Sequence, residues 1–239
     1  MNYLECSNRL VNSLKLTERN KLLGHCEMVQ LAIGQVLATP GETIKYAYFP
    51  TGCLIALIME NDQVKGLEVG LIGQEGMLGI QIMLGTIVVP YKIVVQGKGT
   101  ALRIPSNILL RLIDENSMLN DKLNAYISVL MQQFAQSSVC NRFHLLQERL
   151  VRLLLVFHDR LNSPVFYITQ DLLSSMLGVR RVGVTKAASA LQAMKMIHYV
   201  RGNMEIVDLN GLRKLACTCY DIDIATYKSI LHHAPSTLT

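Results

Sequence analysis

The chain has 239 residues, half of them hydrophobic, and carries a formal net charge of +5 at neutral pH. This length is enough for two modest domains, each with its own core. No run of about eighteen apolar residues is free of charge, so we expect no transmembrane span and no membrane partner. The six cysteines are scattered, which favours a reducing, cytoplasmic location over a disulfide framework.

Charge is distributed unevenly along the chain. Residues 1–140 hold 11 Lys/Arg and 11 Asp/Glu, whereas residues 141–239 hold 12 and 7, so the whole net charge lies in the second part. A neutral part joined to a basic part is typical of a sensor joined to a module that binds a polyanion. The alternative is that the basic residues form an ordinary solvent-exposed surface with no partner. Their position argues against this alternative, because they coincide with the helix-turn-helix and hairpin pattern of residues 168–207.

The first part of the chain, from Val29 onward, consists of short apolar runs separated by Gly, Pro and Asn/Asp. Turn signals at such regular intervals predict an antiparallel sandwich or barrel. The expected strands cover residues 35–38, 47–49, 54–60, 65–71, 91–96 and 100–104.

A long helical region follows from about Asn107, with a break predicted near Asn116 and Ser117. Its apolar stripe is wider than a strict coiled-coil seam, so one side can pack on the sheet domain and the other on a partner chain. We therefore predict a homodimer interface here; the alternative is a helix buried only against its own domain. The predicted interface residues are Leu119, Leu123, Tyr126, Ile127, Leu130 and Phe134.

Another amphipathic helix is predicted over 141–161, ending at Asn162-Ser163-Pro164. Its leucines at 3–4 spacing, from Leu145 to Leu161, would face inward. Glu148 and Arg152 would lie on the outer face, where side chains four residues apart support one another.

The segment 168–207 has the pattern of a helix-turn-helix followed by a hairpin. Thr169 can cap a short helix, Gly178 permits a sharp turn, and a second helix is expected over 180–195. Two short strands around a Gly202-Asn203 turn would then form a wing. Winged helices usually bind DNA. The first turns of the second helix carry Arg180, Arg181, Thr185 and Lys186 on its outer face.

Enzyme and metal motifs are absent from the sequence. There is no phosphate-binding loop, nucleophile elbow or zinc-protease motif, so a ligand-controlled enzyme subunit lacks a catalytic constellation. The six histidines show no zinc-ligand spacing, and Cys217 and Cys219, which follow a last predicted helix, are interpreted as packing residues. No metal, no cofactor and no enzymatic activity are predicted.

Two stretches resemble the CRP/FNR superfamily of dimeric transcription regulators: YFPTGCLIALIMENDQVKGLEVGLIGQEGMLG in the sheet domain and ITQDLLSSMLGVRR in the basic part. The resemblance covers nearly the whole chain. It implies an α+β fold with an N-terminal antiparallel β-roll like a cyclic-nucleotide-binding domain, a long dimerisation helix, and a C-terminal winged helix-turn-helix. The corresponding domains would be residues 1–113, 114–140 and 141–239.

The resemblance also implies which residues contact double-stranded DNA. In the family, the first two turns of the reading helix make base and phosphate contacts, and the wing contacts the backbone. Where many relatives have Glu to read cytosine, this chain has Val182, so an apolar contact to a thymine methyl is one replacement. The predicted contacts are Thr169, Gln170, Arg180, Arg181, Val182, Thr185, Lys186, Arg201 and Asn203.

Signal reception is expected in the β-roll, but the usual cyclic-nucleotide phosphate cassette is incomplete. Gly73, Glu75 and Gly76 form a Gly-rich loop, while Lys92 stands in the region where Arg and a hydroxyl residue belong. Lys offers a point charge without the bidentate fork of Arg. These four residues are the candidate pocket for an unknown small-molecule effector. RNA polymerase is a further candidate partner, and a protein-binding winged helix with a degenerate sensor is the alternative function.

Overall fold

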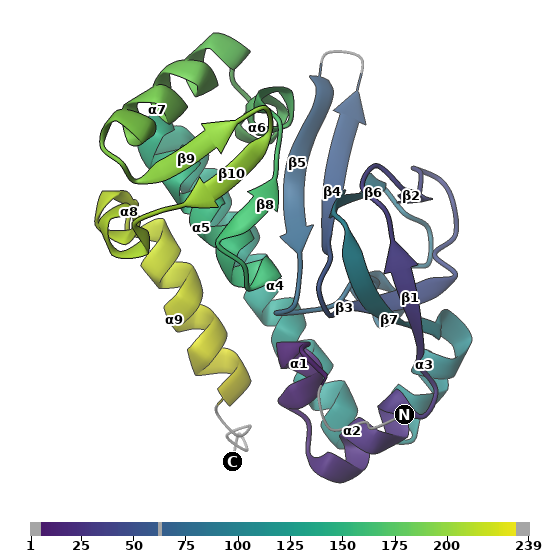
Figure 1. The fold of residues 1–239 in the computed structure, drawn as a ribbon. Helices are drawn as coiled ribbons and strands as arrows, with labels where there is room; N and C mark the ends of the chain where they lie inside the picture. Colours follow the sequence, from purple (N-terminus) through teal and green to yellow (C-terminus); the bar gives the residue numbers. More distant parts are fainter. Residues whose placement is uncertain (1–5, 62–63, 233–239) are drawn as a thin grey trace.

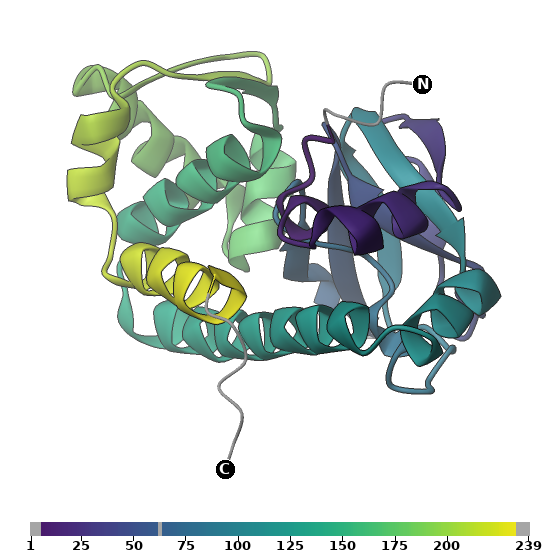
Figure 2. The same ribbon diagram turned by 90° about the horizontal axis from the view of Figure 1, so that it is seen from below.

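The computed structural model describes residues 6–61 and 64–232. Figure 1 shows a lobe rich in strands and a lobe rich in helices, and Figure 2 shows the long helix α4 (Ser117–Phe143) running past both. Asn116 caps α4, because its side-chain Oδ1 accepts a hydrogen bond from the Leu119 N–H at 3.1 Å. The predicted break before this helix is therefore confirmed.

In the part of the chain that the structure describes, seven strands form two antiparallel sheets in the first lobe. One sheet has the order β1-β7-β3 and the other the order β2-β6-β4-β5. Six of these strands match the predicted ones within a few residues, and β1 is additional. The strands are β1 (Glu27–Leu31), β2 (Val36–Ala38), β3 (Tyr46–Pro50), β4 (Leu54–Asn61), β5 (Val64–Ile72), β6 (Lys92–Gly97) and β7 (Gly99–Pro105).

Inward-facing residues of both sheets make the core of this lobe, with Phe49, Ile55, Ile93 and Ile104 fully buried. The short helices α1 (Arg9–Asn12), α2 (Leu16–Leu23), η1 (Ile80–Ile82) and α3 (Ser106–Asp114) surround them. Asn8 connects α1 to the sheet, because its buried Nδ2 donates to the carbonyls of Pro50 and Gly76 at 2.9 and 2.8 Å. A buried amide that is fully hydrogen-bonded fixes the position of a segment at little cost.

The apolar stripe of α4 packs mainly on its own chain. Leu119, Leu123, Tyr126 and Leu130 are buried in the core of the first lobe. Because these four side chains are buried within their own chain, they cannot contact a partner chain in this conformation. Their predicted place in a dimer interface is therefore wrong for this conformation. Of the six predicted interface residues, Ile127 is half-buried and Phe134 is 39% exposed.

Up to residue 232, where the described part ends, the second lobe contains five helices and a three-stranded sheet of order β8-β10-β9. Its core includes residues of the first lobe, because Leu54, Ala56 and Leu71 of β4 and β5 pack with it. The two lobes therefore share a hydrophobic contact. The elements are α5 (Leu146–Leu161), β8 (Val165–Tyr167), α6 (Gln170–Leu177), α7 (Arg181–Ala193), β9 (Ile197–Val200), β10 (Asn203–Ile206), α8 (Leu209–Leu215) and α9 (Cys219–His232).

Two sequence predictions fail at the junction of the lobes. A single helix was expected over 141–161, but α4 continues to Phe143 and a new helix starts only at Leu146, leaving Leu145 exposed. Arg152 was expected in solvent beside Glu148, but its Nη2 lies 2.6 Å from the Asp223 carboxylate and both side chains are largely buried. Glu148 instead accepts the Leu145 N–H at 2.9 Å.

Helix α9 was not predicted, and it lies alongside α4 (Figure 2). The ammonium of Lys122 donates to the Leu231 carbonyl at 2.7 Å, and the hydroxyl of Tyr227 donates to the Glu75 carbonyl at 2.6 Å. These contacts join the C-terminal helix to the first lobe. Among the described residues, no helix has both the length and the apolar character needed to cross a membrane.

Candidate functional site

The helix-turn-helix forms for the local reasons that the sequence indicated. Thr169 caps α6 by accepting the Leu172 N–H at 3.1 Å, and Gly178 ends that helix with φ +62°, in the left-handed region that favours glycine. Arg180 then stands in extended conformation before α7. One face of α7 is buried and contains Val184, Ala188 and Leu191. The opposite face is therefore exposed to solvent.

The solvent face at the start of α7 carries the predicted DNA-reading residues. Arg180, Arg181, Thr185 and Lys186 are exposed, and Val182 is 65% exposed although it is apolar. They therefore form one accessible surface of mixed cationic, hydroxyl and apolar groups. Helix α7 ends at Ala193, two residues before the end of the helix expected over 180–195, and Met194 after it is exposed.

Side-chain contacts connect the start of α6 to α7. The hydroxyl of Thr185 donates to Gln170 Oε1 at 2.8 Å, and Arg181 Nη1 lies 3.4 Å from Asp171 Oδ1. Both members of the Arg181–Asp171 pair are exposed, so the pair contributes little stability. The guanidinium can therefore exchange Asp171 for another anion at small cost. Thr169 and Gln170 are half-buried, with their polar groups engaged in the cap and the inter-helix contact.

The wing is a hairpin of β9 and β10, with its turn one residue earlier than predicted. Arg201 and Gly202 occupy the turn with φ +50° and +87°, and Asn203 already pairs with Val200 in the ladder. Two successive positive φ values match the twist of a two-residue hairpin turn. Arg201 and Asn203 are both exposed at this tip, and a side chain at Gly202 would collide with the ring of Tyr167 in the third strand, β8.

The predicted effector loop is filled by the chain's own side chains. The buried Glu75 carboxylate accepts the Gly73 N–H at 3.0 Å and lies 3.4 Å from Arg160 Nε of α5. A Cβ on Gly76 would overlap the phenol of Tyr126, and one on Gly73 would overlap Arg160. The glycines thus permit close packing of α4 and α5 on the loop.

Lys92 is not part of that loop. It starts β6, and its ammonium lies 3.7 Å from the Glu60 carboxylate of β4. The structure therefore does not bring the four predicted effector residues together into one pocket.

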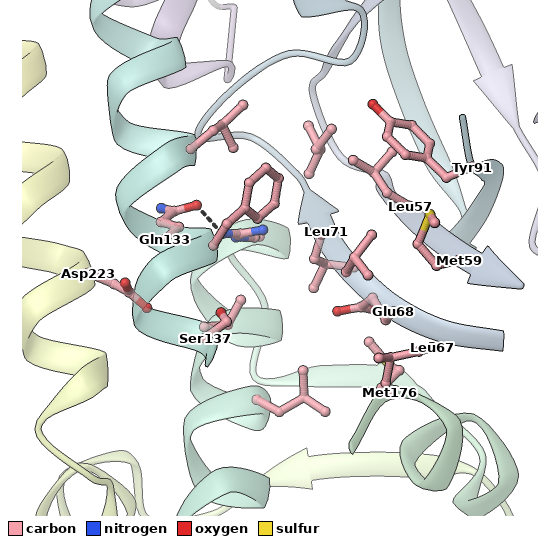
Figure 3. A pocket seen from close by; sticks show the side chains of 18 of the residues that line it. Leu57, Met59, Leu67, Glu68, Leu71, Tyr91, Gln133, Ser137, Met176 and Asp223 are labelled. Atoms are coloured by element: carbon pink, nitrogen blue, oxygen red, sulfur yellow. Dashed lines mark hydrogen bonds between the residues drawn. The ribbon is translucent and has the colours of Figure 1, made fainter. Parts of the chain in front are cut away.

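A cavity of about 480 Å³ lies instead between β5, α4 and the helices of the second lobe. Figure 3 shows Leu71, Met59 and Tyr91 on the sheet side, Gln133 and Ser137 on α4, and Met176 of α6. The walls are thus mainly apolar and come from both lobes, which the sequence could not indicate.

Glu68 is one of several charged residues that line this cavity, together with Arg149, Arg152, Arg160 and Asp223 (Figure 3). Its Oε2 is shielded from solvent and has no hydrogen-bond partner in the described part of the chain. Burial raises the pKa of Glu68 to about 8, and the charge of Arg160 acts in the opposite direction without offsetting it. Arg160 is engaged elsewhere, since its Nη2 donates to Gln133 Oε1 at 3.2 Å (dashed in Figure 3) and its Nε faces Glu75. The carboxyl is therefore a neutral hydrogen-bond donor over much of the acidic range.

Sequence reasoning missed a second cluster, formed by Cys140, His144, Cys217 and Cys219. Cys217 and Cys219 do pack, as interpreted, but a third thiol and an imidazole from the end of α4 join them. The available signal was the Cys-x-x-x-His spacing of 140 and 144, which can place both side chains on one side of a helix end.

Comparison with known proteins agrees with this geometry. Residues 148–215 match the Crp-like helix-turn-helix domain family. The chain thus contains a Crp-like helix-turn-helix domain, and it has the fold of the CRP/FNR transcription regulators, as the sequence predicted. No curated protein sequence matches the chain.

Solved structures show the same fold at low sequence identity. FixK2 from Bradyrhizobium japonicum is 11% identical with a TM-score of 0.66, over 80% of this chain and 98% of its own. A CRP-family transcriptional regulator from Thermus thermophilus is 13% identical with a TM-score of 0.66, over 79% and 96%. The c-di-GMP-responsive global regulator CLP of Xanthomonas campestris is 15% identical with a TM-score of 0.62, over 80% and 99%.

Proposed function

We propose that the protein is a dimeric, sequence-specific DNA-binding transcription regulator whose DNA affinity is set by a small-molecule signal. The observation that carries this proposal is the exposed basic start of α7, set in a helix-turn-helix with a cationic wing tip. Arg180, Arg181 and Lys186 lie on one accessible surface, and Arg201 lies at the tip of the wing. Such an arrangement places cations on phosphates while the helix enters the major groove.

The side-chain chemistry of α7 suits base reading as well as phosphate contact. Arg is suited to bidentate hydrogen bonds with guanine, and Thr185 or Lys186 to a phosphate or a base edge. Val182 is largely exposed in the free protein, which is costly for an apolar residue unless a partner covers it. Contact with a thymine methyl would cover it.

Dimerisation is proposed through the part of α4 that its own chain leaves uncovered. Met131 is 67% exposed, and Phe134, Val139 and Phe143 are also exposed along the same helix. A second copy would bury this apolar surface and relate two α7 helices by a two-fold axis. Substituting both Met131 and Phe143 by Glu should convert a dimer into a monomer in light-scattering measurements, whereas Leu16→Glu, at an exposed position of α2, should not.

Signal reception is proposed in the cavity between the lobes. A ligand with an apolar body and a group that accepts a hydrogen bond from Glu68 would fit its walls. It would touch both β5 and α6, which meet where the Ser175 hydroxyl donates to the Gly66 carbonyl. Binding would then shift the population between arrangements of the helix-turn-helix on the sheet.

The test is selection of bound duplexes from a random library, at two salt concentrations, without added ligand. The expected result is a two-fold symmetric motif whose affinity falls steeply as salt rises. The double variant Arg180→Ala/Arg181→Ala should lose the motif. The matched control Lys15→Ala/Lys98→Ala removes the same charge from exposed positions in the first lobe and should retain it. Equal enrichment of the motif by both variants would contradict DNA reading through Arg180 and Arg181 of α7.

A further inference from the structure

Three thiols and one imidazole meet where the two lobes join. Cys140 lies in the last turn of α4, His144 directly follows that helix, and Cys217 and Cys219 lie at the junction of α8 and α9. Their ligand atoms all lie within 4.8 Å of one another. The three cysteines are buried and none of them is in a disulfide. The cluster thus has the ligand types and the number of a closed structural metal site.

We propose that Cys140, His144, Cys217 and Cys219 bind one Zn²⁺ ion. A tetrahedral zinc site with Zn–S bonds of about 2.3 Å has S–S edges of about 3.8 Å. Cys140 Sγ and Cys217 Sγ are 3.6 Å apart, and Cys219 Sγ is 3.3 Å from His144 Nδ1. An ion at the centre therefore requires side-chain adjustments of less than about 1 Å.

The surroundings of the cluster suit metal-bound thiolates. Gln136 Nε2 donates to Cys219 Sγ at 3.0 Å, and a backbone N–H of Cys219 donates to Cys217. Such donors orient thiolate ligands and offset their charge. The Arg152 guanidinium also acts favourably on a Cys140 thiolate.

The site has a structural consequence because of where its ligands lie. Cys140 and His144 flank the end of α4, at the joint with α5, while Cys217 and Cys219 precede α9, which packs back along α4. One ion would therefore hold the joint between the lobes and the C-terminal helix together. This inference does not depend on DNA binding.

The first experiment measures metal in untagged, full-length protein purified without chelator under reducing conditions. Elemental analysis should find one zinc per chain, and cobalt(II) loaded after zinc removal should give the visible bands of a tetrahedral thiolate site. Cys219→Ser and His144→Gln should lower the zinc content and alter the cobalt spectrum. The matched control Cys26→Ser, which changes a half-buried cysteine of the first lobe, should change neither.

A second measurement keeps the proposal testable if the variants do not fold. Native protein is treated with a thiol-alkylating reagent with and without a zinc chelator, and labelled cysteines are located by mass spectrometry. Cys140, Cys217 and Cys219 should be labelled faster once the chelator is present, with no such change at Cys6. The proposal would be overturned if the folded protein contained no zinc and gave no cobalt bands. It would also be overturned if the chelator did not change the labelling rates, or if Cys140 and Cys217 were found in a disulfide.

Discussion

Arginines of the second lobe occupy two opposite environments. Arg180 and Arg181 at the start of α7 are exposed, and Arg181 Nη1 lies 3.4 Å from the exposed Asp171 carboxylate. Arg152 and Arg160 of α5 are largely buried and lie against the buried carboxylates of Asp223 and Glu75. Exposed cations contribute little to folding and are free to meet a polyanion, whereas buried pairs are part of the packing. The same residue type therefore supports two separate tasks, binding and assembly.

The largest expected effect comes from the buried pair. Arg152→Ala should lower the free energy of unfolding by about 3–5 kcal/mol, because it leaves the Asp223 charge buried without a partner. Denaturant titration checks this. The matched double variant Arg152→Met/Asp223→Leu removes both charges and should recover most of the loss. A single variant as stable as the wild type would contradict the role assigned to the pair.

The exposed pair should show the opposite profile. Arg180→Ala/Arg181→Ala should weaken binding to a selected duplex by about 100-fold or more, since each good base contact is worth about 1–3 kcal/mol. The dependence of affinity on salt should also become shallower. The free energy of unfolding should stay within about 0.5 kcal/mol of the wild-type value. A large loss of stability would show that these arginines contribute to folding and are not reserved for DNA binding.

Glu68 extends the comparison to a carboxyl whose shielded Oε2 has no hydrogen-bond partner among the described residues. Its pKa in the folded chain is about 8, above the usual 4.5, so the folded state holds an extra proton between these values. Stability is therefore fully present below about pH 4.5 and falls as pH rises towards 8, by at most about 1.4 kcal/mol per pH unit. Glu68→Gln should remove this component from the pH profile of unfolding, and an unchanged profile would argue against a buried, neutral Glu68.

The smallest expected effect concerns the helix-turn-helix itself. Thr169→Ala removes the cap on the Leu172 N–H and should lower the free energy of unfolding by about 1 kcal/mol. Thr169→Ser keeps the hydroxyl and should lower the free energy of unfolding by less than Thr169→Ala does. Thermal unfolding of the two variants measures the difference, and equal losses would assign the effect to the methyl group.

The parts of the fold that follow from local signals were predictable from the sequence. The Thr169 cap, the Gly178 turn and the buried face of α7 depend on residues within a few positions of one another, and all three are present. The strands of the first lobe were likewise marked by their turns. The wing turn was displaced by one residue because Arg201 adopts a positive φ that is uncommon for a side-chain residue.

Features that depend on distant residues were not predictable. Arg152 has the spacing of a surface residue, and its burial follows from Asp223, 71 positions later on a helix that the sequence did not indicate. Cys140 and Cys217 are 77 positions apart. Glu75 matched a ligand-binding pattern, but Arg160 of α5 occupies its carboxylate. The tertiary arrangement decides each of these cases, and local periodicity carries no information about it.

The most direct test of the central proposal is a spacing series on the selected duplex. Two α7 helices related by a two-fold axis read half-sites about one helical turn apart, so affinity should be highest at a centre-to-centre spacing of about 10–10.5 base pairs. Inserting about half a turn, roughly 5 base pairs, should abolish tight binding, because the second helix would then face the wrong side of the duplex. Affinity that does not depend on the spacing would contradict a dimer that reads DNA through α7.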